Sequence, residues 1–216
     1  METIDVFDEL YNPLNPPTAS IDEVHRKGLW HQTFACWIFH PQRRTVLLQQ
    51  RGPRNRIDPG SFDASASGHL SVGETPQQGF REVEEELGLF VPDEKRHYLG
   101  KFLNIATRGD YINREFCHIF LAESLATPDT LTLQRGEVSG IYAAPIDEAI
   151  ALFSGDIKKF TAQGRAWDVN AYTKAVQDIS IPLMCNWQER CGTLRYYLKV
   201  MQAAQSLLNG APLSAF

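Results

Sequence analysis

A glutamate-rich segment bracketed by glycines, GHLSVGETPQQGFREVEEELGL at residues 68–89, constrains this chain more than any other stretch. Its second half predicts a helix over residues 76–87, with Thr75 as N-cap, Pro76 at the first helical position and Gly88 as the stop. One face of this helix is apolar and is expected to pack on a core: Phe80, Val83 and Leu87. The opposite face carries three carboxylates at helical spacing: Glu82, Glu85 and Glu86.

Three like charges at this spacing repel one another by roughly a few tenths of a kcal/mol per pair, and Arg81 alone does not neutralise them. For glutamates considered alone, a solvated acidic helix face is the ordinary interpretation. Clustered carboxylates are also the ligands that Mg²⁺ and Mn²⁺ prefer, and these ions are commonly shared with substrate phosphates. The residues that flank the carboxylates favour a metal site over a solvated acidic face. Gly68 frees a backbone carbonyl for an ion, Gly73 permits a tight turn, and Arg81 can hold a neighbouring carboxylate through a bidentate pair.

In this order the residues resemble the motif of the Nudix hydrolases: Gly, five residues, Glu, seven residues, then Arg-Glu-apolar-any-Glu-Glu-any-Gly-apolar. We call residues 68–89 the glutamate box. Every named position is filled, but six residues separate Glu74 from Arg81 where the family has seven. The shorter spacing leaves residues 81–86 in register with one another and puts in question how Glu74 and the Gly68 carbonyl are placed relative to them.

The resemblance implies an α/β fold, an α/β/α sandwich around a mixed sheet, and hydrolysis of a diphosphate linked to another group. The substrate would be a small nucleoside-diphosphate-like or other organic diphosphate. The resemblance also implies Mg²⁺, with Mn²⁺ as a substitute, held by the box glutamates and one carbonyl while Arg81 orients them. The implied metal ligands are Gly68, Glu82, Glu85 and Glu86.

A second resemblance, to the branch of the family related to isopentenyl diphosphate isomerase, covers about residues 4–150. It rests on VHRKGLWH, the strand end LLQQR, DPGSFDASASGH and NREFC. In that isomerase three histidines and two glutamates bind a metal, and a cysteine does acid/base work. This chain keeps four of those positions, which leaves a second metal site open: His25, His31, His69 and Glu115.

Two positions depart from the isomerase pattern: Asn113 stands where the other glutamate is expected and Ser67 where the cysteine is expected. A serine hydroxyl is a far poorer proton donor and acceptor near neutral pH than a cysteine thiol, so isomerisation would lack a catalytic group. A Nudix hydrolase is therefore the leading hypothesis. An isomerase of isopentenyl diphosphate and a non-catalytic ligand-sensing module are the alternatives.

Further candidate residues lie outside the box. The predicted loop at residues 51–60 carries Arg51, Arg54 and Arg56, which suits phosphate binding, although a solvated loop is the plain alternative. Either Glu115 or Glu137 could deprotonate the attacking water, since the choice depends on geometry. The predicted catalytic set is Arg81, Glu82, Glu85 and Glu115.

Short β-rich runs flank the box and predict strands at 33–40, 45–50, 62–67, 98–105, 115–122 and 138–143. A helix over 146–153 completes a predicted domain of residues 1–154. Residues 155–216 are expected to form a helical C-terminal extension packed on the same domain. Its apolar stripe at helical spacing consists of Leu194, Tyr197, Leu198, Met201 and Leu208.

The formal net charge is −5, and the glutamate box supplies −4 of it through five acids and one base. Affinity for a polyanion comes chiefly from Lys and Arg, so the net negative charge argues weakly against nucleic acid, and a nucleic-acid polymer is not an expected partner. No run of about 18 apolar residues occurs, and the start METIDVFDELYN is acidic, so neither a membrane span nor secretion is expected.

Four cysteines without a CxxC pair are typical of a reducing compartment, which predicts a cytoplasmic protein with buried thiols: Cys36, Cys117, Cys185 and Cys191. The oligomeric state, including a homodimer, stays open.

Overall fold

The computed structural model describes residues 2–185 and 190–213, with the backbone alone at 190–193. The strands are β1 (Thr3–Phe7), β2 (Pro13–Ser20), β3 (Trp30–His40), β4 (Thr45–Arg51), β5 (Phe62–Asp63), β6 (Ala66–His69), β7 (Arg96–Arg108), β8 (Tyr111–Glu123), β9 (Val138–Pro145), β10 (Lys159–Asp168) and β11 (Ala171–Ser180). The α-helices are α1 (Ile21–Lys27), α2 (Arg81–Leu87), α3 (Ile146–Ser154) and α4 (Arg190–Leu208). Single 3₁₀ turns are η1 (Gln78–Phe80), η2 (Asp93–Lys95), η3 (Pro128–Thr130) and η4 (Ile181–Leu183).

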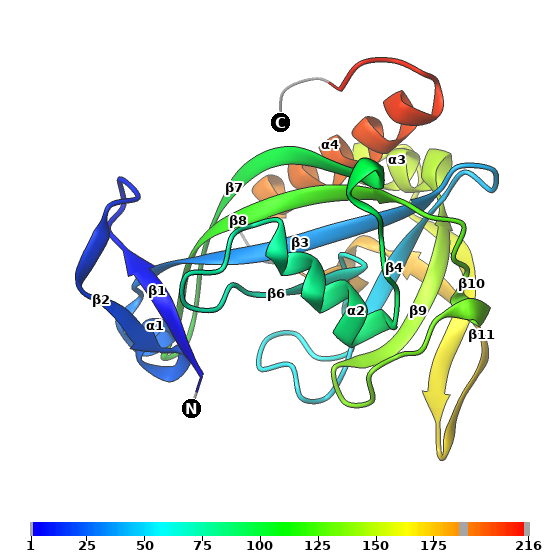
Figure 1. The fold of residues 1–216 in the computed structure, drawn as a ribbon. Coiled ribbons are helices and arrows are strands. Elements are labelled where there is room, and N and C mark those ends of the chain that lie inside the picture. Colours follow the sequence, from blue (N-terminus) through cyan, green and yellow to red (C-terminus); the bar gives the residue numbers. More distant parts are fainter. Residues whose placement is uncertain (1, 186–189, 214–216) are drawn as a thin grey trace.

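The sheet is mixed, as the family resemblance implies, and strand β3 lies at its centre. It pairs in parallel with β8 and antiparallel with β1, β4 and β6, and the sheet runs on through β4 to β9, β10 and β11 (Figure 1). The apolar run TFACWIF gives β3 buried side chains on both faces, which suits a strand covered from both sides.

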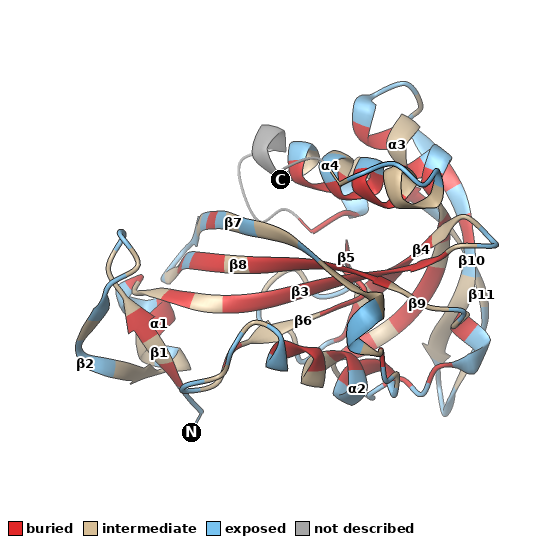
Figure 2. Cartoon of the chain, turned by 45° about the horizontal axis from the view of Figure 1, so that its top comes forward, coloured by how far each residue is buried: buried red, intermediate tan, exposed pale blue. Residues whose placement is uncertain are grey.

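Helices cover both faces of the sheet. Helix α2 packs on one face, where Val83 and Leu87 meet Phe34 of β3 in one core cluster. Helices α3 and α4 cover the other face, where Tyr197 and Met201 join a second cluster (Figure 2). The predicted α/β/α sandwich is confirmed.

The helix of the glutamate box begins later than the sequence predicts. Residues 76 and 77 form a turn, η1 follows, and α2 proper starts at Arg81 and ends at Leu87, with Gly88 as its C-cap at a φ of 62°. The side chain of Gln78 accepts hydrogen bonds from the backbone N (2.8 Å) and the Oγ1 (2.9 Å) of Thr75, and the first of these is one of the two hydrogen bonds of a capping box. The 3₁₀ turn at 78–80 lies between Glu74 and Arg81, where the box is one residue shorter than the family pattern.

The C-terminal extension contains more than the predicted helix. Its apolar stripe is confirmed in α4, but residues 159–180 form a hairpin that the sequence interpretation missed, β10–β11, which continues the sheet beyond β9. Gly164 permits this pairing because a Cβ there would overlap the backbone carbonyl of Ile141. The alternation in KFTAQGRAWD and AYTKAVQDIS was the available signal. The boundary at residue 154 stays a prediction.

The thiols are mostly buried. Cys36 and Cys185 are buried, Cys117 is half-buried, and the side chain of Cys191 lies outside the described residues. Across residues 2–185 and 190–213, no helix has the length and apolar character that crossing a membrane requires.

Candidate active site

A cavity of about 390 Å³ lies beside α2 and reaches Tyr196 of α4. It brings together most residues that the sequence predicts as functional: His25, Arg51, Arg54, Arg56, Gly68, His69, Arg81, Glu82, Glu85, Glu86, Glu115 and Glu137. These residues come from α1, α2, the strands at the centre of the sheet and the loops at 52–61 and 134–137. The cavity has two ends, which we call the box end and the histidine end.

Arg81 contacts three glutamates at the box end. It binds Glu74 in the bidentate manner that the sequence predicts for a neighbouring carboxylate, through Nε (3.1 Å) and Nη2 (3.1 Å). Its Nη1 lies 3.1 Å from Glu82 Oε1 and 3.0 Å from Glu85 Oε2, so the guanidinium stands between two predicted metal ligands. Although burial acts to raise the pKa of Glu74, the hydrogen bonds from Arg81 and Ser71 outweigh it and lower that pKa. The six-residue spacing therefore leaves Glu74 in contact with Arg81.

The absence of a side chain at Gly68 makes room for the Glu82 carboxylate. A Cβ at residue 68 would overlap the Glu82 carboxylate, so the glycine is needed for the side chain of α2 as well as for its own carbonyl. The Glu82 side chain is only 14% exposed. Burial raises the pKa of Glu82 to about 7, against the opposing effect of Arg81.

Glu86 is the most buried carboxylate of the box, at 5% exposure. Its Oε2 accepts hydrogen bonds from Gln49 Nε2 (2.9 Å) and from the backbone N of Ser67 (3.2 Å). Burial, with repulsion from Glu82 and Glu137, raises the pKa of Glu86 to about 8. Burying such carboxylates together is unfavourable unless a positive charge accompanies them, so their oxygen donors fit a hard divalent cation.

The histidine end is built differently. The ligand atoms of His25, His31 and His69 all lie within 4.8 Å of one another, and among the described residues no other trio of His, Cys, Asp or Glu side chains meets that limit. His25 Nε2 lies 3.1 Å from His69 Nε2 and 3.0 Å from the Tyr111 hydroxyl. We call these three residues the histidine cluster.

Burial keeps the histidine cluster uncharged. It lowers the pKa of His25 to about 3 and that of His31 to about 4, and it lowers the pKa of His69 as well. His31 Nδ1 lies 3.0 Å from the carbonyl of Leu29, which leaves Nε2 toward the cluster, 3.8 Å from Glu115 Oε1. Neutral imidazole is the form that binds transition metals.

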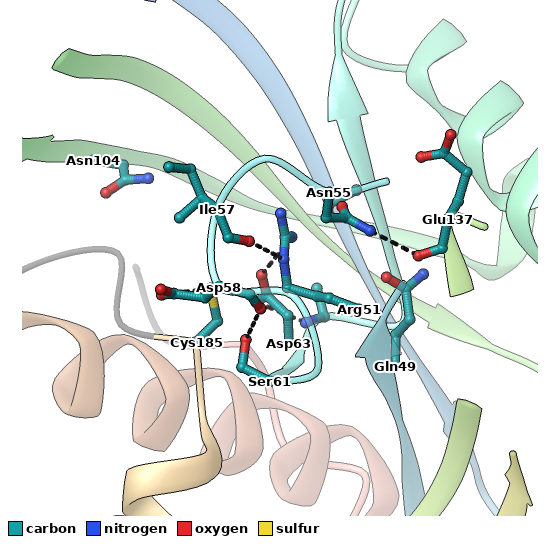
Figure 3. A network of polar contacts seen from close by, with 12 residues as sticks. Gln49, Arg51, Asn55, Ile57, Asp58, Ser61, Asp63, Asn104, Glu137 and Cys185 are labelled. Carbon is teal, nitrogen blue, oxygen red and sulfur yellow. Dashed lines mark hydrogen bonds and ion pairs between the residues drawn. The ribbon is translucent and has the colours of Figure 1, made fainter. Parts of the chain in front are cut away.

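The three arginines of the 51–60 region differ in burial and in the groups that their side chains contact. Arg51 is buried, with Nη1 3.3 Å from Asp63 Oδ2 and Nε donating to the carbonyl of Ile57 at 3.0 Å, so it holds the 52–61 loop against the sheet (Figure 3). Arg56 is exposed and pairs with Asp22 at 2.5 Å. Arg54 is exposed at the cavity wall beside Gly136.

The two candidate bases lie at different ends. Glu137 lies beside the box, where its charge acts on Glu86, and its carbonyl accepts 2.8 Å and 2.7 Å hydrogen bonds from Asn55 Nδ2 and Gly52 N (Figure 3). Glu115 belongs to the histidine end, where its Oε2 accepts a 2.7 Å hydrogen bond from Asn104 Nδ2.

Sequence reasoning missed two buried polar residues of the cavity region, Gln49 and Asn104. Gln49 follows the apolar run VLL of β4, and Asn104 interrupts the apolar run in FLNIA of β7. A polar residue within an apolar run of a strand was the signal that could have found them.

Comparisons with known proteins agree with this geometry. The family profile described as NUDIX domain matches residues 29–164, more than half of the chain. An uncharacterised Nudix hydrolase of Clostridium acetobutylicum is 36% identical over 165 residues, 76% of this chain and 79% of that protein. An isopentenyl-diphosphate Delta-isomerase of Serratia proteamaculans is 35% identical over 105 residues, 48% of this chain and 57% of that protein. A crystal structure of a Deinococcus radiodurans protein shares the fold, with a TM-score of 0.56 and 19% identity over 71% of this chain and 90% of that one.

The chain therefore belongs to the NUDIX family, as the glutamate box predicts. It is an enzyme of the pyrophosphohydrolase class, and relatives named as isopentenyl-diphosphate isomerases support the second resemblance.

Proposed function

We propose that this chain hydrolyses the diphosphate bond of a small nucleoside-diphosphate-like or other organic diphosphate, in the cytoplasm. The proposed metal is Mg²⁺, with Mn²⁺ as a substitute, and its proposed ligands are Glu82, Glu85, Glu86 and the carbonyl of Gly68. The main support for the proposal is the pair of buried carboxylates, Glu82 and Glu86. Their pKa values are raised because the two side chains are buried and the protein supplies too little positive charge to stabilise both as anions.

Bound there, a divalent ion would neutralise phosphate oxygens and acidify the attacking water. The protein's own groups do the positioning. Gln49 and the backbone N of Ser67 hold Glu86, while Glu74 holds Arg81, which in turn orients Glu82 and Glu85.

Two further roles follow from position. Glu137 is our proposed base, because it lies beside the box glutamates whereas the predicted Glu115 contacts Asn104 and the histidine end. Arg54 and Arg56, exposed at the cavity, are proposed to bind the substrate's phosphates. The buried Arg51 faces Asp63 and is proposed to hold the loop that carries them.

The test is turnover of a panel of nucleoside, sugar, isoprenoid and cofactor diphosphates with Mg²⁺. At least one member is expected to be hydrolysed, and Glu85→Gln should lower that rate about 100-fold or more. Glu84→Gln is the matched control, because Glu84 lies on the same helix, is exposed and does not line the cavity. No turnover of any member, or equal loss in the two variants, would refute the proposal.

A second divalent ion is proposed for the histidine cluster, which supplies three neutral nitrogen donors within 4.8 Å. The purified protein should carry about one equivalent of a transition metal that His69→Gln loses and His97→Gln, a half-buried histidine outside the cluster, keeps. Elemental analysis measures this directly, and the same metal content in all three proteins would exclude the site.

The cluster, with Glu115 nearby, also favours isopentenyl-diphosphate isomerisation as a second candidate function. Ser67 opposes it, since no thiol stands beside the cavity at that position. Deuterium exchange into isopentenyl diphosphate in heavy water, followed by NMR, decides the question: exchange supports the isomerase and its absence removes it.

A further inference from the structure

The sheet surface that lines the cavity, which we call the cavity floor, is polar, whereas a sheet face covered by a helix is ordinarily apolar. Strands β3, β7 and β8 place Thr33, Asn104 and Glu115 there, all buried and all lining the cavity. Farther along the same strands the core is apolar, with Trp37 of β3 and Leu121 of β8 packed under α4. The polar group therefore coincides with the cavity rather than with the core.

Asn104 is the most informative of these residues. It is 4% exposed, and its Nδ2 donates a 2.7 Å hydrogen bond to Glu115 Oε2. Its Oδ1 is buried and meets no hydrogen-bond donor among the residues that the structure describes. A buried amide oxygen without a donor is destabilising, which points to a donor supplied by a ligand.

Glu115 places a second acceptor beside the first. Asn104 and Glu115 are cross-strand partners in the β7–β8 pair, so their side chains share the cavity face. Glu115 Oε1 lies 3.8 Å from His31 Nε2, beyond hydrogen-bonding distance. An amide oxygen and a carboxylate thus stand side by side at this part of the floor.

An aromatic wall adjoins these two acceptors. The rings of Phe102 and Tyr196 are stacked at 4.8 Å with an interplanar angle of 24°, and both line the cavity together with Ala35 and Cys117. Such a surface packs against a flat ring.

We propose that this part of the cavity binds the organic half of the diphosphate substrate and selects a flat ring that carries an amino group. An amino group has two N–H donors, one for Asn104 Oδ1 and one for the Glu115 carboxylate. A ring carbonyl or an isoprenoid chain offers no donor and leaves Asn104 Oδ1 buried without a partner. A hydroxyl offers a single donor and adds nothing to the hydrogen bond that Glu115 already accepts from Asn104. The inference rests on the proposed diphosphate hydrolysis and adds the substrate class to it.

Matched nucleotides test the selection. CDP and UDP differ by an amino group against a carbonyl at nearly constant size, and ADP and IDP differ in the same way on a larger ring. In α,β-methylene analogues, carbon replaces the bridging oxygen, so binding can be measured with Mg²⁺ present and no cleavage of that bridge. We expect the amino member of at least one pair to bind about tenfold tighter or more, with the same order in kcat/KM for the natural nucleotides.

Asn104→Leu should reduce that preference to less than threefold, while Asn209→Leu, at an exposed asparagine after α4, should leave it intact. The wild-type comparison decides the matter even if the cavity variant fails to fold. Dissociation constants equal within twofold in both pairs, or no binding of any analogue at millimolar concentration, would overturn the inference.

The two proposals fail separately. An amino preference in binding without hydrolysis of any panel member refutes the proposed reaction and leaves the subsite standing. Hydrolysis of panel members with no amino preference refutes the subsite and leaves the reaction standing.

Discussion

The box end and the histidine end of the cavity offer donor groups of opposite character. At the box end the donors are carboxylate oxygens that carry charge, and Arg81 stands between Glu82 and Glu85. At the histidine end the donors are neutral nitrogens, already gathered within 4.8 Å. The difference indicates that the box end depends on an added cation to balance its charge, whereas the histidine end is preorganised without one.

The largest effect is expected at Gly68. Comparing its substitution with that of a second glycine tests whether residue 68 matters because of its contact in the box or only because any glycine gives backbone flexibility. Gly68→Ala should lower hydrolysis about 100-fold, because the added Cβ would displace the Glu82 carboxylate. Gly155→Ala is the control: its φ of 88° makes the substitution strained, but it has open space around it and lies outside the cavity. That variant should lose about 1 kcal/mol of stability and little activity. Steady-state kinetics and urea unfolding of both variants measure the two effects, and similar activity in the two would contradict this role of Gly68.

A smaller effect is expected at Gln49, which holds Glu86 from the neighbouring strand. Gln49→Leu removes the 2.9 Å hydrogen bond to Oε2 and should lower kcat about tenfold. Gln50→Leu is matched in sequence, but the Gln50 amide donates to the carbonyl of Gly60 instead, so it should change kcat less than threefold. Equal losses would mean that Gln49 acts only through the packing of β4.

The two ends also predict opposite effects of pH on the metal-free protein. Folded Glu82 and Glu86, with pKa values of about 7 and about 8, keep protons that the unfolded chain releases above about pH 4.5, so they lower stability as pH rises toward 8. His25 and His31 have pKa values of about 3 and about 4 in the folded protein, so they stay unprotonated at pH values below about 6.5 where the unfolded chain binds protons. They therefore lower stability as pH falls.

Between pH 6.5 and 8 the glutamates dominate among these four groups. The free energy of unfolding in EDTA should fall across that interval, and Glu86→Gln should flatten the slope while Glu84→Gln keeps it. Urea titrations at three pH values provide the measurement. A slope unaffected by Glu86→Gln would show that this carboxylate does not hold its proton in the folded state.

The same contrast explains what the sequence could predict. The box end was predictable because its residues lie within one segment, where helical spacing alone places Glu82, Glu85 and Glu86 together. The histidine cluster joins α1, β3 and β6, so its convergence needed the resemblance to a family and then the fold. Asn104 was missed because its importance lies in its partner across the β7–β8 pair and in a cavity that only tertiary packing creates.

The fold shows a similar division. The strands around the box and the apolar stripe of α4 follow from local periodicity, whereas the mixed sheet follows from the family resemblance, and the structure contains all three. The β10–β11 hairpin was missed because many of its residues are exposed and polar, so its strands lack the apolar character of a core strand.

The central claim is that water attacks phosphorus at the box end with the help of a divalent ion. Hydrolysis in ¹⁸O-labelled water, with mass spectrometry of the products, tests it most directly. A turned-over diphosphate should yield a phosphate-containing product with one ¹⁸O per cleavage, only with Mg²⁺ or Mn²⁺ present, and Glu85→Gln should abolish most of that label. Unlabelled phosphate products, or labelling that persists in EDTA, would contradict the claim.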